Sequence, residues 1–462
     1  MNESIIISEK AREQISARAG LIGLGLKIKQ LGILKPIETE VKIGQKTVKY
    51  TPCEKLTDGL IAILAGAKGL VEVNKRVRSD LALQVAFGRD GCAEQSVVQD
   101  TLDACTDSNV KQMQAAVESI LRTHSQVARH DYRQAWLIVE VDMTGRPCGR
   151  KAEFASKGYF AKQRNRRGRQ EGYVVASQYG EIVVKRIYDG TTQLNTALQP
   201  LMQAAQQALA WTAEQRTRII LRVDSGGGSI KDVNWALEQD YQVHGKDYSG
   251  SRAEHLAESV TEWVTDPRDA DRQMGWVTET TELYLRPVKR IAVRCRKNNG
   301  QWAGGVILST LSARDVLQLT EQPLEKETDP HSVLLAYVRF YDQRGGGVEI
   351  EIKEDKQGFQ ISKRNKKRFA AQQMVCQLEA LAHNLLVWTR RWLSLLCPKI
   401  ASFGMLRMVR DILQITGRIW IDEQKNVRKI ILNPADPFAK HIQAGFAALL
   451  AAEQVAVCLG ET

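Results

Sequence analysis

The sequence predicts an α/β protein with a helical N-terminal domain and a β-rich module inserted into the α/β core. Two apolar runs of strand length, residues 135–141 (AWLIVEV) and 218–223 (RIILRV), have the near-continuous hydrophobic pattern of buried strands. Between them, residues 194–210 are rich in Ala, Gln and Leu and have the pattern of a long helix. The periodicity before these runs is mainly helical, and after them it alternates as in antiparallel strands.

Length and charge limit the class of protein. The chain has 462 residues, enough for two or three domains. Lys and Arg outnumber Asp and Glu by 65 to 53, which gives a net charge of +12. A basic chain suits a polyanion such as DNA, because each neutralised phosphate releases counterions.

Neither a membrane span nor a zinc site is predicted. The most apolar stretch, residues 378–396, is interrupted by Glu379, His383 and two arginines, so it reads as a helix with one buried face. The eight cysteines form no C-x-x-C pair, and no secretory signal is recognised at the N-terminus. We therefore expect a cytoplasmic protein with reduced thiols.

Residues 1–130 are expected to be mainly helical. Short apolar-periodic runs cover 58–66 and 80–87, and longer ones cover 93–105 and 108–121, with Asp107 or Ser108 as the N-cap of the last. The pair of helices joined near Thr106 fits a DNA-reading pair and equally fits the packing of any small helical domain.

The core begins with strands and then alternates. A hairpin is expected over 172–188, and a helix follows the second apolar strand at 229–238. Three strands, helix, strand, helix is the order with which an RNase H-like domain begins. Alternating segments at 277–285, 289–296 and 302–309 predict the inserted β-rich module, a helix returns at 369–396, and residues 419–432 resemble a hairpin. The expected segments are a helical DNA-binding or dimerisation domain at 1–130, core at 131–248, β-rich module at 249–330, core at 331–396 and a C-terminal region at 397–462.

Two aspartates follow the two buried strands directly. Asp142 comes after the first strand, and Asp224 comes after the second and opens the turn Ser225-Gly226-Gly227-Gly228. Strand ends meet at one edge of such a sheet, where α/β proteins build their sites. Carboxylates brought together repel each other and need a cation, for which Mg²⁺ is suited. Either aspartate alone is ordinary, since strand-end aspartates commonly cap turns.

A third acidic position lies further along the chain. Glu349 and Lys356 are seven residues apart, so on a helix they share one face. However, residues 348–353 (VEIEIK) alternate like a strand. Glu351 is the alternative third carboxylate, and Glu349 is preferred because it keeps the seven-residue step to Lys356.

These residues resemble the bacterial insertion-sequence DDE transposases, which carry a Y-x2-R-x3-E-x6-K signature. Tyr341, Arg344, Glu349 and Lys356 match it in type and order. Residues 141–145 (VDMTG), 224–226 (DSG) and 378–386 (LEALAHNLL) resemble other motifs of the family, so the resemblance covers about residues 135–395. Four residues, not three, separate Arg344 from Glu349, and the family places this glutamate on a helix.

The resemblance implies an enzyme that cuts at the terminal inverted repeats of an insertion sequence and joins the 3′-hydroxyl ends to target DNA. It implies two Mg²⁺ ions, or Mn²⁺ in their place, held by Asp142, Asp224 and Glu349, with Asp142 between them. Tyr341, Arg344 and Lys356 would contact phosphates, and two copies of the chain would act together on double-stranded DNA. The alternatives are a transposase-derived DNA-binding protein without catalysis and another RNase H-like nuclease.

Two basic clusters are expected on the DNA path. The first is Lys363, Arg364, Lys366, Lys367 and Arg368, and the second is Lys162, Arg164, Arg166, Arg167 and Arg169. Trp276 and Trp302 lie in the β-rich module; relatives use an aromatic residue there to hold a flipped base, but core packing is the preferred role for both.

Overall fold

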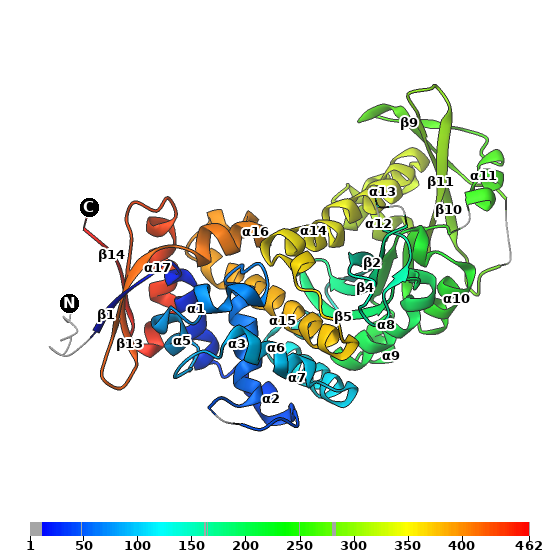
Figure 1. Ribbon diagram of the computed structural model, residues 1–462. Helices are drawn as coiled ribbons and strands as arrows, with labels where there is room; N and C mark the ends of the chain where they lie inside the picture. Colours follow the sequence, from blue (N-terminus) through cyan, green and yellow to red (C-terminus); the bar gives the residue numbers. More distant parts are fainter. Residues whose placement is uncertain are drawn as a thin grey trace. The chain divides into compact units, whose positions relative to one another are not determined.

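The computed structural model describes residues 12–461 apart from 48, 161, 162, 164, 249 and 280–282. The chain forms two compact units, each built from separated segments (Figure 1). Unit 1 consists of Met1–Ser125, Pro147–Ala155 and Glu351–Thr462, and unit 2 of Gln126–Arg146 and Ser156–Ile350. The finer boundaries of the five expected segments stay a prediction.

Unit 1 is mainly helical and encloses one apolar core. Its helices are α1 (Ala19–Gln30), α2 (Lys35–Glu40), α3 (Pro52–Leu64), α4 (Val73–Arg76), α5 (Leu81–Ala86), α6 (Gln95–Asp103), α7 (Asp107–His124), α15 (Phe369–Ser394), α16 (Met405–Arg407) and α17 (Ala439–Leu449). The helices expected near 58–66, 80–87, 93–105, 108–121 and 369–396 are therefore confirmed. Thr106 is the N-cap of α7 rather than Asp107 or Ser108, and it forms a capping box with Asn109.

A four-stranded sheet completes unit 1. Its strands are β1 (Arg12–Ser16), β12 (Gly417–Ile421), β13 (Val427–Leu432) and β14 (Ala456–Leu459), in the order β1-β12-β13-β14. The expected hairpin at 419–432 is the antiparallel pair β12–β13. The first strand of the chain thus pairs with strands from its last fifty residues.

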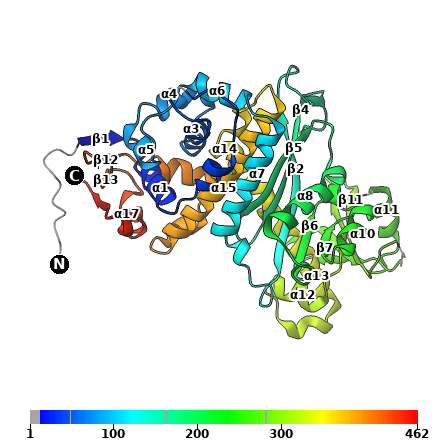
Figure 2. The same ribbon diagram turned by 90° about the horizontal axis from the view of Figure 1, so that it is seen from below.

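Unit 2 contains a long mixed sheet. Its strands are β2 (Leu137–Pro147), β3 (Ser156–Lys157), β4 (Arg167–Ala176), β5 (Glu181–Asp189), β6 (Ile219–Val223), β7 (Gln242–Lys246), β8 (Val264–Asp266), β9 (Asp269–Trp276), β10 (Lys289–Arg296) and β11 (Trp302–Ser309). The order is β3-β4-β2-β6-β7-β11-β10-β9-β8, with β5 on β4. Strands β2, β6 and β7 are parallel, whereas β4–β5 and β7–β11 are antiparallel. Figure 2 labels β2, β4, β5, β6, β7 and β11 of this sheet.

Helices cover this sheet. They are α8 (Leu194–Leu209), α9 (Ala213–Arg216), α10 (Ile230–Glu238), α11 (Gly250–Glu258), α12 (Ala313–Leu319) and α13 (Pro330–Asp342). The predicted order of two paired strands, helix, strand and helix after β2 is confirmed. Among the described residues, no helix combines the length and hydropathy needed to cross a bilayer.

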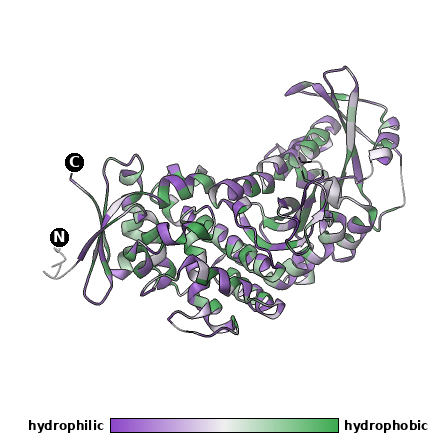
Figure 3. Cartoon of the chain, viewed as in Figure 1, coloured by the Kyte–Doolittle hydropathy of each residue, from purple (hydrophilic) through white to green (hydrophobic). Residues whose placement is uncertain are grey.

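The inserted β-rich strands extend the core sheet instead of forming a layer of their own, because β11 pairs with β7. Two of the three expected segments, 289–296 and 302–309, are β10 and β11. The third, 277–285, is wrong: the strand ends at Trp276, residues 277–279 are not in a strand, and 280–282 lie outside the described residues. Strand β9 is mostly polar, as Figure 3 shows, so its sequence carries little hydrophobic signal.

Residues 348–353 form a helix, although their alternation predicts a strand. Helix α14 (Val348–Gly358) starts in unit 2 and continues into unit 1. Val348 and Ile352, four residues apart, are buried, while Ile350 between them is 47% exposed. That is the period of a helix, and three alternating apolar residues are too few to distinguish it from a strand.

Helix α13 identifies the face of the sheet that matters for the candidate site. Ile220 of β6 shares an apolar cluster with Tyr337 and Phe340 of α13. Since side chains alternate along a strand, Arg222 and the following Asp224 lie on the same side as Ile220.

Candidate active site

Asp142 and Asp224 occupy equivalent positions on neighbouring parallel strands. The register of β2 against β6 pairs Glu140 with Arg222 and Val141 with Val223. The next position on each chain is an aspartate, so the register brings the two carboxylates to the same face and the same level. The sequence predicted that Asp142 directly follows the strand. Strand β2 instead continues to Pro147, so Asp142 lies within it.

The turn after Asp224 is fixed by its own carboxylate and by glycine. Asp224 Oδ1 accepts a hydrogen bond from the Gly226 amide at 2.8 Å. A Cβ on Gly228 would lie 1.8 Å from the carbonyl oxygen of Lys246 on β7. The Gly-rich run is therefore required because the backbones of the turn and of β7 approach closely.

Tyr341 lies in the last turn of α13, Arg344 in the short turn between α13 and α14, and Glu349 in the first turn of α14. The Arg344 guanidinium is buried, with Nη2 3.4 Å from Asp142 Oδ2 and Nη1 2.8 Å from Glu349 Oε1. Arg344 thus joins the β2 aspartate to the first turn of α14. Its Nε and Nη2 atoms have no hydrogen-bond partner within the described part of the chain.

Burial and neighbouring charges shift the pKa values of two site residues, Asp142 and Tyr341. The pKa of the Asp142 carboxyl is raised to about 6: burial is the largest cause, the Arg344 charge opposes it, and the charges of Asp224 and Glu349 add to it. Burial likewise raises the pKa of the Tyr341 hydroxyl to about 12, so the phenol stays protonated at neutral pH. Ionisation of Asp142 at neutral pH therefore lowers the stability of the folded protein.

The three carboxylates do not form a ready-made metal cage. No group of three His, Cys, Asp or Glu side chains arranged to hold a metal ion occurs among the described residues. The Arg344 guanidinium forms ion pairs with both Asp142 and Glu349, and so it supplies the positive charge next to these two carboxylates. Oxygen donors with an electrostatic need for a cation nevertheless fit a hard divalent ion.

The chain matches the family described as transposase DDE domain group 1 over residues 3–452. It belongs to this family of DDE transposases. Enzymes of this class generally use divalent metal ions. Among solved structures, it is similar to a piggyBac transposase in a synaptic complex with hairpin DNA, with 13% identity, a TM-score of 0.44, and coverage of 85% of this chain and 79% of the other. No curated protein matches it.

The alternative third carboxylate of this transposase, Glu351, has different surroundings. Burial raises the pKa of the Glu351 carboxyl, and its neighbouring charges are His383, Asp355 and Arg390 of unit 1. Asp355 Oδ1 lies 2.8 Å from Nδ1 of the buried His383 on α15. Lys356 is also in unit 1, two turns after Glu349 along α14.

The first basic cluster of the transposase is only partly exposed. Arg364 is buried and donates to the carbonyl oxygens of Phe359 and Ala62, at 2.9 and 3.3 Å. Lys366 is buried too, donates to Gln99 Oε1 at 2.7 Å, and has its pKa lowered to about 8 by burial. Two of the five expected DNA contacts are therefore corrected to internal supports of unit 1. The exposed members are Lys363, Lys367 and Arg368.

The second basic cluster and the two tryptophans also contain both exposed and buried residues. Lys162 and Arg164 lie outside the described residues, Arg166 and Arg167 are exposed, and Arg169 is buried. Trp276 packs against Tyr337 with ring centroids 5.7 Å apart, which fits core packing. Core packing is wrong for Trp302, which is 41% exposed. The Arg294 guanidinium lies 4.6 Å from its ring and 3.7 Å from that of Trp263.

Sequence reasoning missed Glu140 and Arg222. Each lies two residues before a catalytic aspartate candidate, and both are buried in an ion pair. The signal was available, because a single charged residue inside an apolar strand needs a partner. The repeated pattern of charge, Val, Asp in the two strands (EVD and RVD) is that signal.

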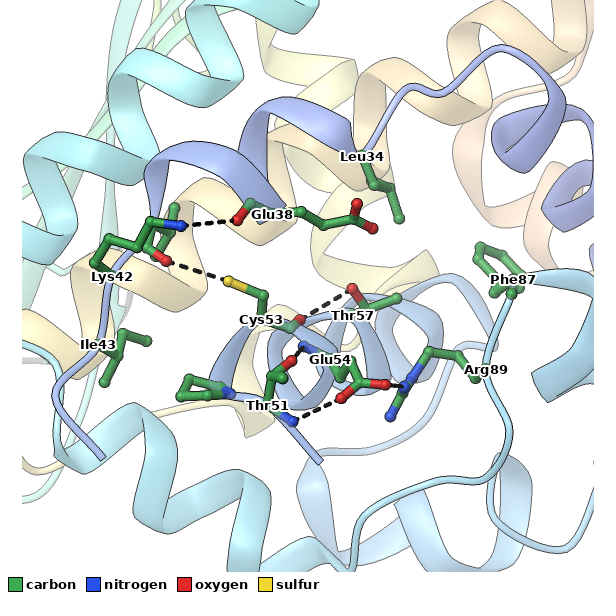
Figure 4. A pocket seen from close by; sticks show the side chains of 13 residues that line it. Leu34, Glu38, Lys42, Ile43, Thr51, Cys53, Glu54, Thr57, Phe87 and Arg89 are labelled. Atoms are coloured by element: carbon green, nitrogen blue, oxygen red, sulfur yellow. Dashed lines mark hydrogen bonds and ion pairs between the residues drawn. The ribbon is translucent and has the colours of Figure 1, made fainter. Parts of the chain in front are cut away.

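A cavity of about 500 Å³ in unit 1 contains none of these residues. It lies between α2 and α3, and Figure 4 shows Arg89 reaching Glu54 across one side. Glu54 also accepts from the Thr51 amide at 2.6 Å, as part of the capping box that starts α3. These charged lining groups are engaged in holding α3, so the candidate chemistry stays with unit 2.

Proposed function

We propose that this transposase cuts DNA at the terminal inverted repeats of an insertion sequence and joins the freed 3′-hydroxyl ends to target DNA. The observation that carries the proposal is the register of β2 and β6, which aligns Asp142 with Asp224. Glu349 would be the third carboxylate, since Arg344 links it to Asp142, whereas Glu351 lies among charges of unit 1.

Asp142, Asp224 and Glu349 would hold two Mg²⁺ ions, for which Mn²⁺ would substitute. When bound, such ions activate the attacking oxygen and stabilise the leaving oxygen of an in-line displacement. The fit rests on the oxygen donor set and on the raised pKa of Asp142, which comes first from burial and then from the charges of Asp224 and Glu349; a bound cation would stabilise the ionised carboxylate against both effects.

Two displacements at phosphorus account for the reaction. In the first, a water oxygen bonds to the phosphorus as the bond to the 3′ oxygen breaks, which leaves a 5′-phosphate and a 3′-hydroxyl. In the second, this 3′-hydroxyl loses its proton and bonds to a target phosphorus, and the displaced target 3′ oxygen takes up a proton. Asp142, Asp224 and Glu349 would be the residues that hold the ions during both displacements.

The basic residues of the site would bind the DNA backbone. Arg344, whose Nε has no hydrogen-bond partner among the described residues, would contact a phosphate oxygen. Tyr341 would donate its retained phenolic proton to a phosphate, and Lys356 would add a charge from α14. Because both element ends must reach one target, we propose that two copies of the chain act together on double-stranded DNA. Lys363, Lys367 and Arg368 would add exposed charge to this path.

The test is cleavage of a DNA duplex carrying the inverted repeats that flank the coding region, with Mg²⁺ and with EDTA. We expect cuts at the repeat ends that require Mg²⁺ and disappear in Asp224→Asn. Asp271→Asn is the matched control, because Asp271 is an exposed aspartate of the same unit and should leave cleavage unchanged.

Tight binding of the repeats by the wild type, without cleavage in Mg²⁺ or Mn²⁺, would instead identify a DNA-binding protein with an idle carboxylate site. Cleavage that survives in Asp224→Asn would show that the carboxylates are misassigned.

A further inference from the structure

A second row of charges lies directly beneath the two aspartates. Glu140 of β2 and Arg222 of β6 are register partners, and both are buried. Arg222 Nε donates to Glu140 Oε1 at 2.7 Å. Each lies two residues before its aspartate, so all four side chains project from the same face of the sheet.

Both members of this pair also reach out of the sheet. Arg222 Nη1 donates to the carbonyl oxygen of Phe340 at 2.9 Å, at the end of α13. Glu140 Oε2 accepts from the amide of Val348 at 2.7 Å, at the start of α14. Phe340 and Val348 flank residues 341–347. Arg222 and Glu140 therefore bind the backbone at both ends of this segment.

Residues 341–349 carry the remaining groups of the candidate site. Tyr341 follows Phe340, Arg344 lies in the middle, and Glu349 follows Val348. A carboxylate at the first amide of a helix also satisfies an otherwise unpaired donor and interacts favourably with the helix dipole. Strands β2 and β6 therefore carry the two aspartates and, through Glu140 and Arg222, also bind the backbone at Phe340 and Val348.

Glycine at 347 is required by the same contact. A Cβ on Gly347 would lie 2.4 Å from Glu140 Oε2 and 3.0 Å from the carboxyl carbon. The four-residue spacing between Arg344 and Glu349 includes this glycine, where the family signature has three residues. The departure in spacing therefore falls where the Glu140 carboxylate needs room.

Burial alone does not explain the pair. Apolar residues of similar size often replace a buried ion pair without loss of stability. What apolar side chains do not provide are the acceptor for the Val348 amide and the donor for the Phe340 carbonyl.

We propose that Glu140 and Arg222 are positioning residues that hold Tyr341, Arg344 and Glu349 in place over Asp142 and Asp224. The inference rests on the proposed function, because it concerns the placement of the carboxylates assigned there. Loss of the Glu140 carboxylate would release the start of α14 and so move Glu349 away from the two aspartates.

The test compares Glu140→Gln and Gly347→Ala with Glu181→Gln in the full-length protein. Glu181 is a matched control: it is equally buried in unit 2 and accepts from two backbone amides, those of Gln126 and Val127, at 2.9 Å each. Hydrogen exchange of residues 341–349 and electron paramagnetic resonance of bound Mn²⁺ are measured for each variant, with uncut repeat DNA present for the second. Cleavage rate is measured over a range of Mn²⁺ concentrations.

We expect faster exchange at 341–349 in Glu140→Gln and Gly347→Ala, but not in Glu181→Gln. We also expect the Mn²⁺ affinity and the cleavage rate to fall by at least about tenfold in the first two variants only, as for other residues that orient metal ligands. DNA affinity should change little, which separates misplacement of the site from loss of binding.

Faster exchange with unchanged Mn²⁺ affinity and cleavage would overturn the proposal, because the pair would then be structural only. Unchanged exchange would overturn it as well. Wild-type protein that neither binds Mn²⁺ nor cuts would contradict the proposed function instead; exchange at 341–349 would then decide whether the pair holds the segment.

Discussion

Replacing Asp142 by Asn should make the metal-free protein more stable while abolishing cleavage. The Asp142 side chain is 15% exposed, and its pKa is raised from 3.8 to about 6, first by burial and then by Asp224 and Glu349. At about 1.4 kcal/mol for each pKa unit, keeping this carboxyl ionised at pH 7 costs about 3 kcal/mol. Asn removes the charge and keeps an oxygen to accept from the Met143 amide.

The stability gained by Asp142→Asn should increase with pH. Because the folded-state pKa is raised, native Asp142 retains its proton between pH 3.8 and about 6 while the unfolded chain has lost it. Wild-type stability therefore falls as pH rises through this window. The advantage of Asp142→Asn should be about 1.5 kcal/mol at pH 5 and about 3 kcal/mol at pH 7, and it should vanish below about pH 4.

The assay is equilibrium urea unfolding in EDTA, with hydrogen exchange of peptides from β2 and β6 to identify the transition of unit 2. Asp271→Asn, at an exposed position, should show no such gain. Added Mg²⁺ should stabilise the wild type but not Asp142→Asn, since only the wild type retains the ligand. A variant that is no more stable than the wild type at pH 7, or whose gain is the same at pH 5, would refute the reasoning.

Three further outcomes follow from the site and its surroundings. Glu349→Gln should lower the cleavage rate at least about 100-fold and Glu351→Gln by no more than about threefold; the reverse order would move the third carboxylate to position 351. Lys363→Ala should reduce the slope of log affinity against log salt by about 0.9, whereas Arg364→Ala should leave the slope unchanged and lower the melting temperature; binding titrations at several salt concentrations and thermal unfolding distinguish the two. Gly228→Ala should abolish cleavage and speed exchange around the turn, because its Cβ would lie 1.8 Å from a backbone oxygen; an active variant with normal exchange contradicts this.

The strands that carry the aspartates were predictable because β6 is buried throughout and β2 is buried at most positions before Asp142. A buried parallel strand is apolar at nearly every position, so 135–141 and 218–223 stand out without an alignment. Strand β9 could not be predicted in this way, since it is half exposed and mostly polar. Helix α14 was misread for a related reason: its first six residues alternate by chance, and only the tertiary contacts of Val348 and Ile352 reveal the helical period.

The sequence shows where the charged residues are, but it does not show which of them are exposed and which bind partners inside the protein. Lys363 and Arg364 are adjacent in sequence and equally basic, yet one is exposed and the other donates to carbonyl oxygens inside unit 1. Nothing local distinguishes them, because the acceptors include Ala62, about 300 residues away. Glu140 and Arg222 show the opposite case: two charges in apolar strands are a local signal of a pair, although the sequence reasoning did not use it.

The discontinuous construction of unit 1 has a consequence for how the protein is made. Its core combines residues from 19 to 120 with residues from 359 to 457, and β1 pairs with β12. During synthesis the N-terminal helices emerge first, but their apolar faces stay uncovered until more than 200 further residues have been translated. Such long-range closure is slow and exposes surfaces that aggregate. A chain that stops before α15 would therefore lack the residues that complete the core of unit 1.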